Sequence, residues 1–276
     1  MIKRFWKKPQ GSAKVRACPV CGQSCAMEIG PLKTNVMLGL ERGEYDLAQC
    51  QACDLVYLSP QPSEADLRTM YVDAPQFNNP TYTDPARVDA IMEYITGCLT
   101  RVLRRGGQSA NVAVSVLEVG AGLAWMCRAA KSLSPKHVTV GQDISPEAVA
   151  KCPWVDFYIL GDLFDASIGE RAPYDVISLT HVIEHLVDPI AVIRRCKTLL
   201  HPGGTIFVTA PHRPIGWKEN SNEISLWESY SYNHVPAHIQ YFAKKSMRKL
   251  ADETGCALDY WSHAHEEGQA FEAWLR

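Results

Sequence analysis

The chain has 276 residues, of which 46% are hydrophobic and 21% charged, and its formal net charge is −2 at pH 7. This composition is typical of a soluble globular protein with one core and room for a smaller module. The nearly neutral balance does not favour nucleic acid or an anionic membrane as a partner. We expect a cytoplasmic protein, because no apolar run approaches the ~20 residues of a membrane helix and the basic start lacks the apolar stretch of a secretory signal.

Residues 1–16 carry six basic side chains and no apolar periodicity, which indicates a flexible lead. Two Cys-x-x-Cys motifs follow, Cys18–Cys21 and Cys50–Cys53, with twenty-eight residues between them. Such a pair lets four thiolates surround one zinc ion tetrahedrally and leaves no open position for substrate. We therefore predict a structural zinc module over residues 17–60, with a hairpin between the motifs. The alternative, four buried reduced cysteines, does not account for the paired spacing.

The segment 61–110 is predicted to be mainly helical and to connect the module to a larger domain. Ser63 precedes a short helix with acidic residues in its first turn. A sustained apolar stripe over 88–103 predicts a longer helix that covers the edge of a sheet. Residues 72–85 are expected to form the loop between these two helices.

The stretch 115–131, SVLEVGAGLAWMCRAAK, predicts a strand, a tight turn and a helix in succession. Gly120 and Gly122 let the backbone approach a ligand closely, and the N-terminus of the following helix offers unpaired N–H groups. A second strand ends in Asp143, twenty-one residues after Gly122, where a doubly wound fold places a carboxylate on ribose hydroxyls. Because Ala124 stands near the position of the third fingerprint glycine, we expect a nucleoside without a pyrophosphate.

The elements that follow alternate between strand and helix, which predicts a parallel sheet with helices on both faces over residues 111–276. Further strands are predicted at 157–160, 176–179, 206–208 and 257–261, with 270–275 as an antiparallel seventh strand. Helices are predicted to start at Ser145–Pro146, at Asp188–Pro189 and at Ser246, the second of them closed by Pro202–Gly204. Residues 212–236 form an aromatic-rich insertion.

Four short motifs occur in order along this domain: LEVGAG at 117–122, GDL at 161–163, YDVISLTHVIEH at 174–185 and LLHPGG at 199–204. Together they resemble the motifs of class I S-adenosylmethionine-dependent methyltransferases. The resemblance covers about residues 112–262. It implies an α/β, Rossmann-like, seven-stranded methyltransferase sheet and an enzyme whose cofactor is S-adenosylmethionine.

In such an enzyme Glu118 and the glycine turn would hold the methionine portion of the cofactor, Asp143 its ribose and Asp162 its adenine amino group. The cofactor-binding residues that the resemblance implies are Glu118, Gly120, Ala121, Gly122, Asp143, Ile144, Asp162, Leu163 and Thr180. It also implies that the loop 72–85 lies over the cofactor. The aromatic side chains of this region either close the site or simply pack: Tyr71, Phe77 and Tyr82.

The catalytic candidates are His181, Glu184 and His185, which follow the fourth strand, and His238, which follows the insertion. A histidine can take the proton that an acceptor hydroxyl loses, and His185 and His238 are the candidate bases. An equally weighted alternative is that Glu184 and His185 have a structural role alone and stabilise this turn. The spacing His181-x-x-Glu184-His185, together with His238, also resembles a divalent-metal pattern in small-RNA 2′-O-methyltransferases and some quinone O-methyltransferases. There the metal lowers the pKa of the acceptor hydroxyl, but the first residue is Glu rather than His181.

The methyl acceptor is predicted to be a small molecule or a sugar or glycan, with oxygen as the favoured atom. A zinc module before this domain also resembles deoxysugar C-methyltransferases, but Val235 and Ala237 stand where those enzymes have Tyr and Glu. An RNA-directed methyltransferase is an alternative, but the basic patch that RNA binding requires is not evident in the sequence. A second, non-enzymatic alternative is a zinc-ribbon binding scaffold. The aromatic residues of the insertion could stack on a sugar ring or build a lid.

Overall fold

The computed structural model describes residues 15–33, 40, 43–73, 80–107, 112–217, 223–262 and 270–276. The basic lead up to residue 14, Phe77 and residues 218–222 of the insertion lie outside this part of the chain. Within the described ranges, no helix is both long enough and apolar enough to cross a membrane.

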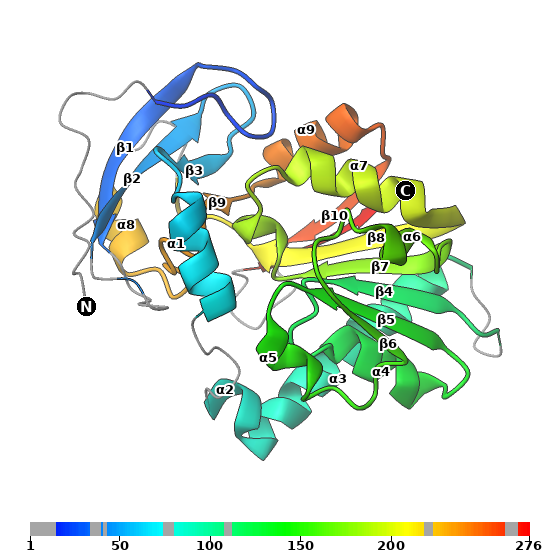
Figure 1. Cartoon of the computed structure of the whole chain (residues 1–276). Coiled ribbons are helices and arrows are strands. Elements are labelled where there is room, and N and C mark those ends of the chain that lie inside the picture. Colours follow the sequence, from blue (N-terminus) through cyan, green and yellow to red (C-terminus); the bar gives the residue numbers. More distant parts are fainter. Residues whose placement is uncertain are drawn as a thin grey trace.

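The larger of two sheets has the strand order β10-β11-β8-β7-β4-β5-β6 (Figure 1). Its strands are β4 (Ser115–Val119), β5 (Val138–Asp143), β6 (Phe157–Leu160), β7 (Tyr174–Thr180), β8 (Leu200–Pro211), β10 (Leu258–Ser262) and β11 (Ala270–Leu275). The strands β4 to β8 are parallel, and β11 runs antiparallel to both β8 and β10. The predicted seven-stranded Rossmann-like sheet with an antiparallel C-terminal strand is therefore confirmed.

Helices cover both faces of this sheet because alternate residues of each strand point to opposite faces. Val116 and Val176 pack with apolar residues of α3 (Pro85–Arg105) and α4 (Trp125–Leu133), whereas Leu117 and Ile177 belong to the core beneath α7 (Pro189–Leu199) and α9 (Lys244–Thr254). Shorter helices lie at α5 (Pro146–Val149) and α6 (Ala166–Gly169). The domain is thus a three-layer sandwich whose loops at the carboxyl edge of the sheet are free to form a site.

The smaller sheet has the order β1-β2-β3-β9, with Cys50 in β2 and the other three predicted zinc ligands in the adjoining loops. Its strands are β1 (Ala26–Lys33), β2 (Glu44–Cys50), β3 (Val56–Leu58) and β9 (Gln240–Tyr241). The predicted hairpin between the motifs is β1 and β2. The fourth strand, β9, comes from the part of the chain that forms the larger sheet and pairs antiparallel with β3. The module therefore extends beyond a single contiguous segment.

Three aromatic residues of the insertion pack under the smaller sheet and are not available to stack on a substrate. Trp217 is 5% exposed, Trp227 0% and Tyr230 6%, and all three share a core with Leu32 and Leu47 of the β1–β2 hairpin. Helix α8 (Ile224–Glu228) of the insertion lies beside β1 (Figure 1). The expectation of stacking or a lid was wrong for these side chains. A hairpin module this small cannot bury enough apolar surface alone, so the insertion completes its core.

Two connections differ from the expectations. Residues 80–83 form a short helix, α2 (Pro80–Thr83), inside the segment predicted to be a loop. Helix α7 ends at Leu199, and Pro202–Gly204 lies within β8 as an irregularity in its pairing with β7, rather than as a closing turn. The helix after Ser63 is confirmed: a capping box starts α1 (Glu64–Arg68), and a π-helix, η1 (Thr69–Asp73), follows directly.

Candidate active site

The glycine turn lies at the point where the strand order reverses, between β4 and β7. After β4 the chain passes through left-handed conformations at Gly120 (φ 58°), Gly122 (φ 49°) and Ala124 (φ 54°) before α4 begins. Open α/β sheets bind ligands at such a switch point, outside the carboxyl ends of the strands. The turn therefore stands where the fold favours a ligand.

The Gly120→Ala substitution is expected to destabilise the protein by about 1–3 kcal/mol. A methyl group there would lie 2.8 Å from Val182 Cγ2, in the loop after β7, and residue 120 is also left-handed. Gly107→Ala is the matched control, because Gly107 has φ 67° and nothing within 4 Å of an added Cβ. Denaturant unfolding of both variants separates backbone strain from the contact. Equal losses in the two variants would show that the Val182 contact is unimportant.

Asp143, the last residue of β5, lies directly beside the glycine turn. Its Oδ2 accepts a hydrogen bond from Gly122 N (2.7 Å), and its Oδ1 accepts one from Ser145 N (2.7 Å). Burial raises the pKa of Asp143, and the backbone N–H bonds oppose this shift. Each carboxylate oxygen has a second lone pair, so the fixed side chain can still accept two hydroxyl groups.

The residues expected around an adenine follow β5 and β6. Gly161 N donates to Asp143 O (2.9 Å), so the loop after β6 starts beside the loop after β5. Ile144 is 44% exposed, and Asp162 is also exposed, whereas Leu163 is buried in the core beneath α7. Leu163 is therefore a packing residue with its side chain directed inward, and Ile144 offers apolar surface to a flat ring.

Glu118 supports the turn from below and does not present its charge to a ligand. Its carboxylate accepts hydrogen bonds from Met126 N (3.2 Å) and Cys127 N (2.9 Å), in the first turn of α4. Burial raises the pKa of Glu118 to about 7, although these two bonds act in the opposite direction. The structure therefore shows Glu118 holding the first turn of α4 beside the glycine turn. Thr180, at the end of β7, has a buried hydroxyl without a partner among the described residues.

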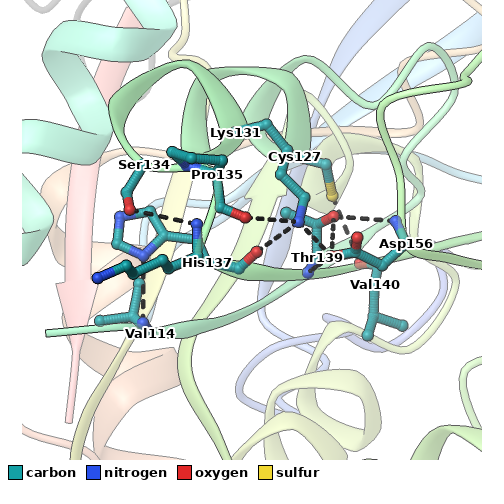
Figure 2. Close-up of polar contacts among 10 residues, drawn as sticks. Val114, Cys127, Lys131, Ser134, Pro135, His137, Thr139, Val140 and Asp156 are labelled. Atoms are coloured by element: carbon teal, nitrogen blue, oxygen red, sulfur yellow. Dashed lines mark hydrogen bonds and ion pairs between the residues drawn. The ribbon is translucent and has the colours of Figure 1, made fainter.

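An ion-pair network fixes the opposite, amino-terminal edge of the same strands (Figure 2). Lys131 Nζ of α4 lies 2.6 Å from Asp156 Oδ2 and donates to His137 O (2.6 Å). The same Asp156 oxygen accepts from Thr139 N (2.8 Å), in the first half of β5. The network connects α4 to the strands at the end remote from the glycine turn. Substitutions of its residues are therefore suitable controls for substitutions at the carboxyl edge.

Aromatic residues on three segments cover the glycine turn from outside. Tyr158 donates its hydroxyl to Gly122 O (2.7 Å), and Trp154 Nε1 donates to Ala124 O (3.1 Å). Tyr82 of α2 packs against the same apolar cluster. For Tyr82 the structure shows packing beside the turn.

Glu184, His185 and His238 meet immediately after β7, and we call them the Glu–His cluster. One ligand atom from each lies within 4.8 Å of the others. Glu184 and His185 are in a short 3₁₀ turn, η2 (Ile183–His185), and Ile239 N donates to Glu184 O (3.0 Å), which holds His238 against that turn. His181 lies beside them, with Nδ1 3.3 Å from Glu184 Oε1. All four catalytic candidates are thus in one place.

Both histidines of the cluster are oriented by backbone carbonyls. His185 Nδ1 lies 2.8 Å from Ala237 O, and His238 Nδ1 lies 3.1 Å from Tyr232 O. A carbonyl only accepts, so each Nδ1 carries a hydrogen and each Nε2 remains for another partner. Carbonyls orient metal-binding histidines in the same way.

The charge state of the cluster is also suited to a cation. Glu184 is fully buried, and neither of its carboxylate oxygens accepts a hydrogen bond from the described residues. Burial lowers the pKa of His238 well below its usual value, and the charges of His185 and His234 lower it further. A neutral imidazole beside a buried carboxylate that lacks a donor can hold a divalent metal or accept a proton.

The four predicted zinc ligands also meet. The Sγ atoms of Cys18, Cys21, Cys50 and Cys53 all lie within 4.8 Å of one another. Cys18 and Cys53 are 3.5 Å apart, and Cys21 and Cys50 are 3.4 Å apart. A tetrahedral site with Zn–S bonds of about 2.3 Å requires sulfurs about 3.8 Å apart, so the arrangement fits zinc. Cys25 is exposed and outside this group.

A hollow of about 400 Å³ beside these cysteines is lined by Lys245, Arg248 and Lys249 of α9. Four thiolates around one divalent ion leave a net negative charge, which these side chains offset. Lys249 also pairs with Glu253 of the same helix (2.6 Å). The basic residues are therefore accounted for by the metal module and its helix.

The comparisons with known proteins agree with this architecture. The family model of the methyltransferase domain matches residues 89–260, more than half of the chain. The chain belongs to this family. Its motifs, its sheet and its switch-point turn are those of a class I methyltransferase domain, as the resemblance implied, and the cysteine cluster is a separate addition before it.

Curated relatives cover this domain only in part. The ubiquinone biosynthesis O-methyltransferase of Xanthomonas campestris pv. campestris is 28% identical over 130 residues, which are 47% of this chain and 51% of that protein. The enzyme of the same name from Xanthomonas oryzae pv. oryzae is 27% identical over 187 residues, 64% of this chain and 74% of that protein. The chain spans about half the length of most curated relatives that it matches.

Among solved structures, the plantazolicin methyltransferase BamL, in complex with a triazolic desmethylPZN analog and SAH, is similar with a TM-score of 0.52. It is 14% identical, and the match covers 72% of this chain and 91% of that one. At this identity the likeness shows the fold.

Proposed function

We propose that this protein is an S-adenosylmethionine-dependent methyltransferase that methylates a hydroxyl oxygen of a small molecule or a sugar. The observation that carries the proposal is the meeting of two sites at one switch point. Gly120, in the turn beside Asp143, directly faces Val182, which lies one residue before η2 and the Glu–His cluster. Methyl transfer is an in-line displacement, and much of its catalysis comes from holding acceptor and methyl group together.

S-adenosylmethionine fits the residues at this edge and supplies the methyl group as a sulfonium. Asp143 accepts the two ribose hydroxyls, and Ile144 and Asp162 face the adenine. Gly120, Ala121 and Gly122 form the cradle, and a side chain at residue 120 would clash with Val182. The buried hydroxyl of Thr180, which lacks a partner among the described residues, is available to a polar group of the cofactor.

The Glu–His cluster holds a divalent cation in this proposal. Two imidazole nitrogens and one carboxylate leave coordination positions for an acceptor oxygen, and a bound cation lowers the pKa of that hydroxyl. The support is the buried carboxylate without a hydrogen-bond donor and the two carbonyl-oriented rings. His181, which stands where the related metal pattern has Glu, contacts Glu184 and is not a member of the three-ligand group.

The cysteine module binds zinc structurally, since four thiolates fill its coordination shell. Oxygen is favoured as the acceptor atom because the cluster offers the means to deprotonate a hydroxyl. The curated relatives that match are O-methyltransferases by name, which agrees with this choice. A scaffold without catalysis would have no use for a buried carboxylate to which no described residue donates a hydrogen bond.

The Asp143→Ala substitution is expected to weaken S-adenosylmethionine binding about 10- to 100-fold, because two charge-assisted hydrogen bonds to the ribose are lost. Calorimetric titration measures this effect. Asp156→Ala is the control: it also removes a carboxylate that accepts two backbone or side-chain bonds, but at the amino-terminal edge of the sheet. Unchanged affinity of the Asp143 variant would reject the ribose assignment.

The acceptor class is tested by incubating the protein and labelled S-adenosylmethionine with panels of phenols, sugars and RNA, with and without Mg²⁺ or Mn²⁺. The proposal expects methylated phenols or sugars, with the label on oxygen by mass spectrometry. Transfer to RNA alone would establish the RNA-directed alternative. Binding of the cofactor without transfer to any panel, in protein shown to be folded, would favour the scaffold.

A further inference from the structure

Tyr71 reaches the Glu–His cluster from a distant part of the chain. Its hydroxyl lies 2.8 Å from His185 Nδ1 and donates to Ala237 O (2.9 Å). The two rings are in edge contact, with centroids 5.5 Å apart and an interplanar angle of 71°. The Tyr71 hydroxyl therefore connects three segments of the chain: η1, η2 and the loop before β9.

The hydrogen atoms in this group can be placed from the distances. His185 Nδ1 is 2.8 Å from Ala237 O, and two lone pairs at that separation would repel, so Nδ1 carries a hydrogen. The Tyr71 hydroxyl then donates to Ala237 O, and its oxygen accepts from Nδ1–H.

We propose that Tyr71 is a positioning residue of the acceptor site: its hydroxyl is a second partner, beside Ala237 O, that fixes the ring of His185, so that Nε2 presents its lone pair toward Glu184 and His238. His185 Nε2 lies 3.9 Å from Glu184 Oε1, the direction in which a cation or an acceptor proton would be met. The role of Tyr71 toward a cation rests on the proposed function, whereas its hydrogen bond to His185 does not.

The local backbone suits such a role. Tyr71 lies in the π-helix η1, a rare conformation that is frequent at functional sites because it shifts one residue out of the α-helical register. The adjacent Met70 is fully buried, so the segment is anchored to the core while the ring of Tyr71 reaches the cluster. Outer-sphere partners of this kind change metal affinity without touching the metal.

The Tyr71→Phe substitution removes only the hydroxyl and tests the proposal. Tyr174→Phe is the matched control, because Tyr174 also donates its hydroxyl to a backbone carbonyl, Ile168 O (2.9 Å), but outside the cluster. Three quantities are measured for the full chain: S-adenosylmethionine affinity, Mn²⁺ affinity by calorimetry, and solvent exchange of the His185 Nδ1–H proton by NMR. The NMR signal is assigned by its loss in His185→Gln.

The expected result for Tyr71→Phe is about tenfold weaker Mn²⁺ binding, with about tenfold faster exchange of the Nδ1–H proton and unchanged cofactor affinity. The Tyr174 variant should match the wild type in all three quantities. Unchanged Mn²⁺ affinity and unchanged exchange in Tyr71→Phe would overturn the proposal, since the ring would then only pack.

Failure of the proposed function is distinguishable from failure of this inference. If the wild-type protein binds the cofactor but no Mn²⁺, the cation assignment is wrong, and the exchange rate of the Nδ1–H proton alone decides the role of Tyr71. Faster exchange in Tyr71→Phe would still support a positioning role for the hydroxyl, and an unchanged rate would reject it.

Discussion

The His238→Gln variant is expected to lose about 10²- to 10⁴-fold in kcat while its affinity for S-adenosylmethionine remains that of the wild type. His238 contributes a neutral imidazole to the cluster, and Gln supplies neither a base nor a good ligand for a divalent metal. Binding of the cofactor should persist because the glycine cradle and the residues proposed for its ribose and adenine lie on the loops after β4, β5 and β6. Steady-state kinetics with the best acceptor and calorimetry with the cofactor give the two quantities.

His137→Gln is the matched control for this experiment. His137 is 4% exposed and His238 is 5% exposed, and both use Nδ1 in a hydrogen bond to the backbone. His137 lies in the network at the amino-terminal edge of the sheet (Figure 2). A comparable loss of kcat in both variants would show that any buried histidine matters for stability, and would remove the catalytic assignment of His238.

The Cys50→Ser variant is expected to lose its zinc and to unfold the smaller sheet under conditions in which the wild type is folded. Structural zinc contributes about 10–16 kcal/mol in zinc-finger peptides, far more than a small core can replace. The consequence reaches the cluster, since Leu58 N donates to Ile239 O (2.9 Å), the residue after His238. We therefore expect kcat to fall strongly, while cofactor affinity, which depends on the larger sheet, changes little.

Elemental analysis, limited proteolysis and thermal unfolding measure the effect of the Cys50 substitution. Cys25→Ser is the control, because Cys25 is an exposed thiol close in sequence but outside the four-sulfur group. Retention of full zinc content by Cys50→Ser would reject the four-thiolate site. Loss of zinc with normal kcat would instead show that the module does not hold His238 in place.

Local patterns determined a large part of the fold. The Cys-x-x-Cys spacing, the glycine turn followed by Asp143 and the start of α7 at Asp188–Pro189 depend on neighbours in the sequence, and the structure has the expected elements there. The alternation of strands and helices predicted a parallel sheet with helices on both faces, because parallel strands need crossover connections. These features require no knowledge of distant contacts.

The sequence alone could not determine what depends on distant contacts. Strand β9 pairs with β3 although more than 180 residues separate them in the chain, and two residues of extended backbone carry no signal of their own. An aromatic residue such as Trp227 could either stack on a substrate or pack in a core. Only the core that it shares with the β1–β2 hairpin shows that it packs there. Glu118 caps α4 because the turn places two N–H groups over its carboxylate, which the motif itself does not specify.

The candidate site illustrates the same division. The sequence determined which residue types follow each strand, and hence that His181, Glu184 and His185 would lie at the carboxyl edge of the sheet. The resemblance to a metal pattern had grouped His238 with them, but only the tertiary structure brought Tyr71 there, since it is 114 residues from His185 and its direction depends on one π-helical turn. Residue order constrains local conformation and periodicity, whereas a site built from three segments is decided by packing, in which each contact depends on all the others.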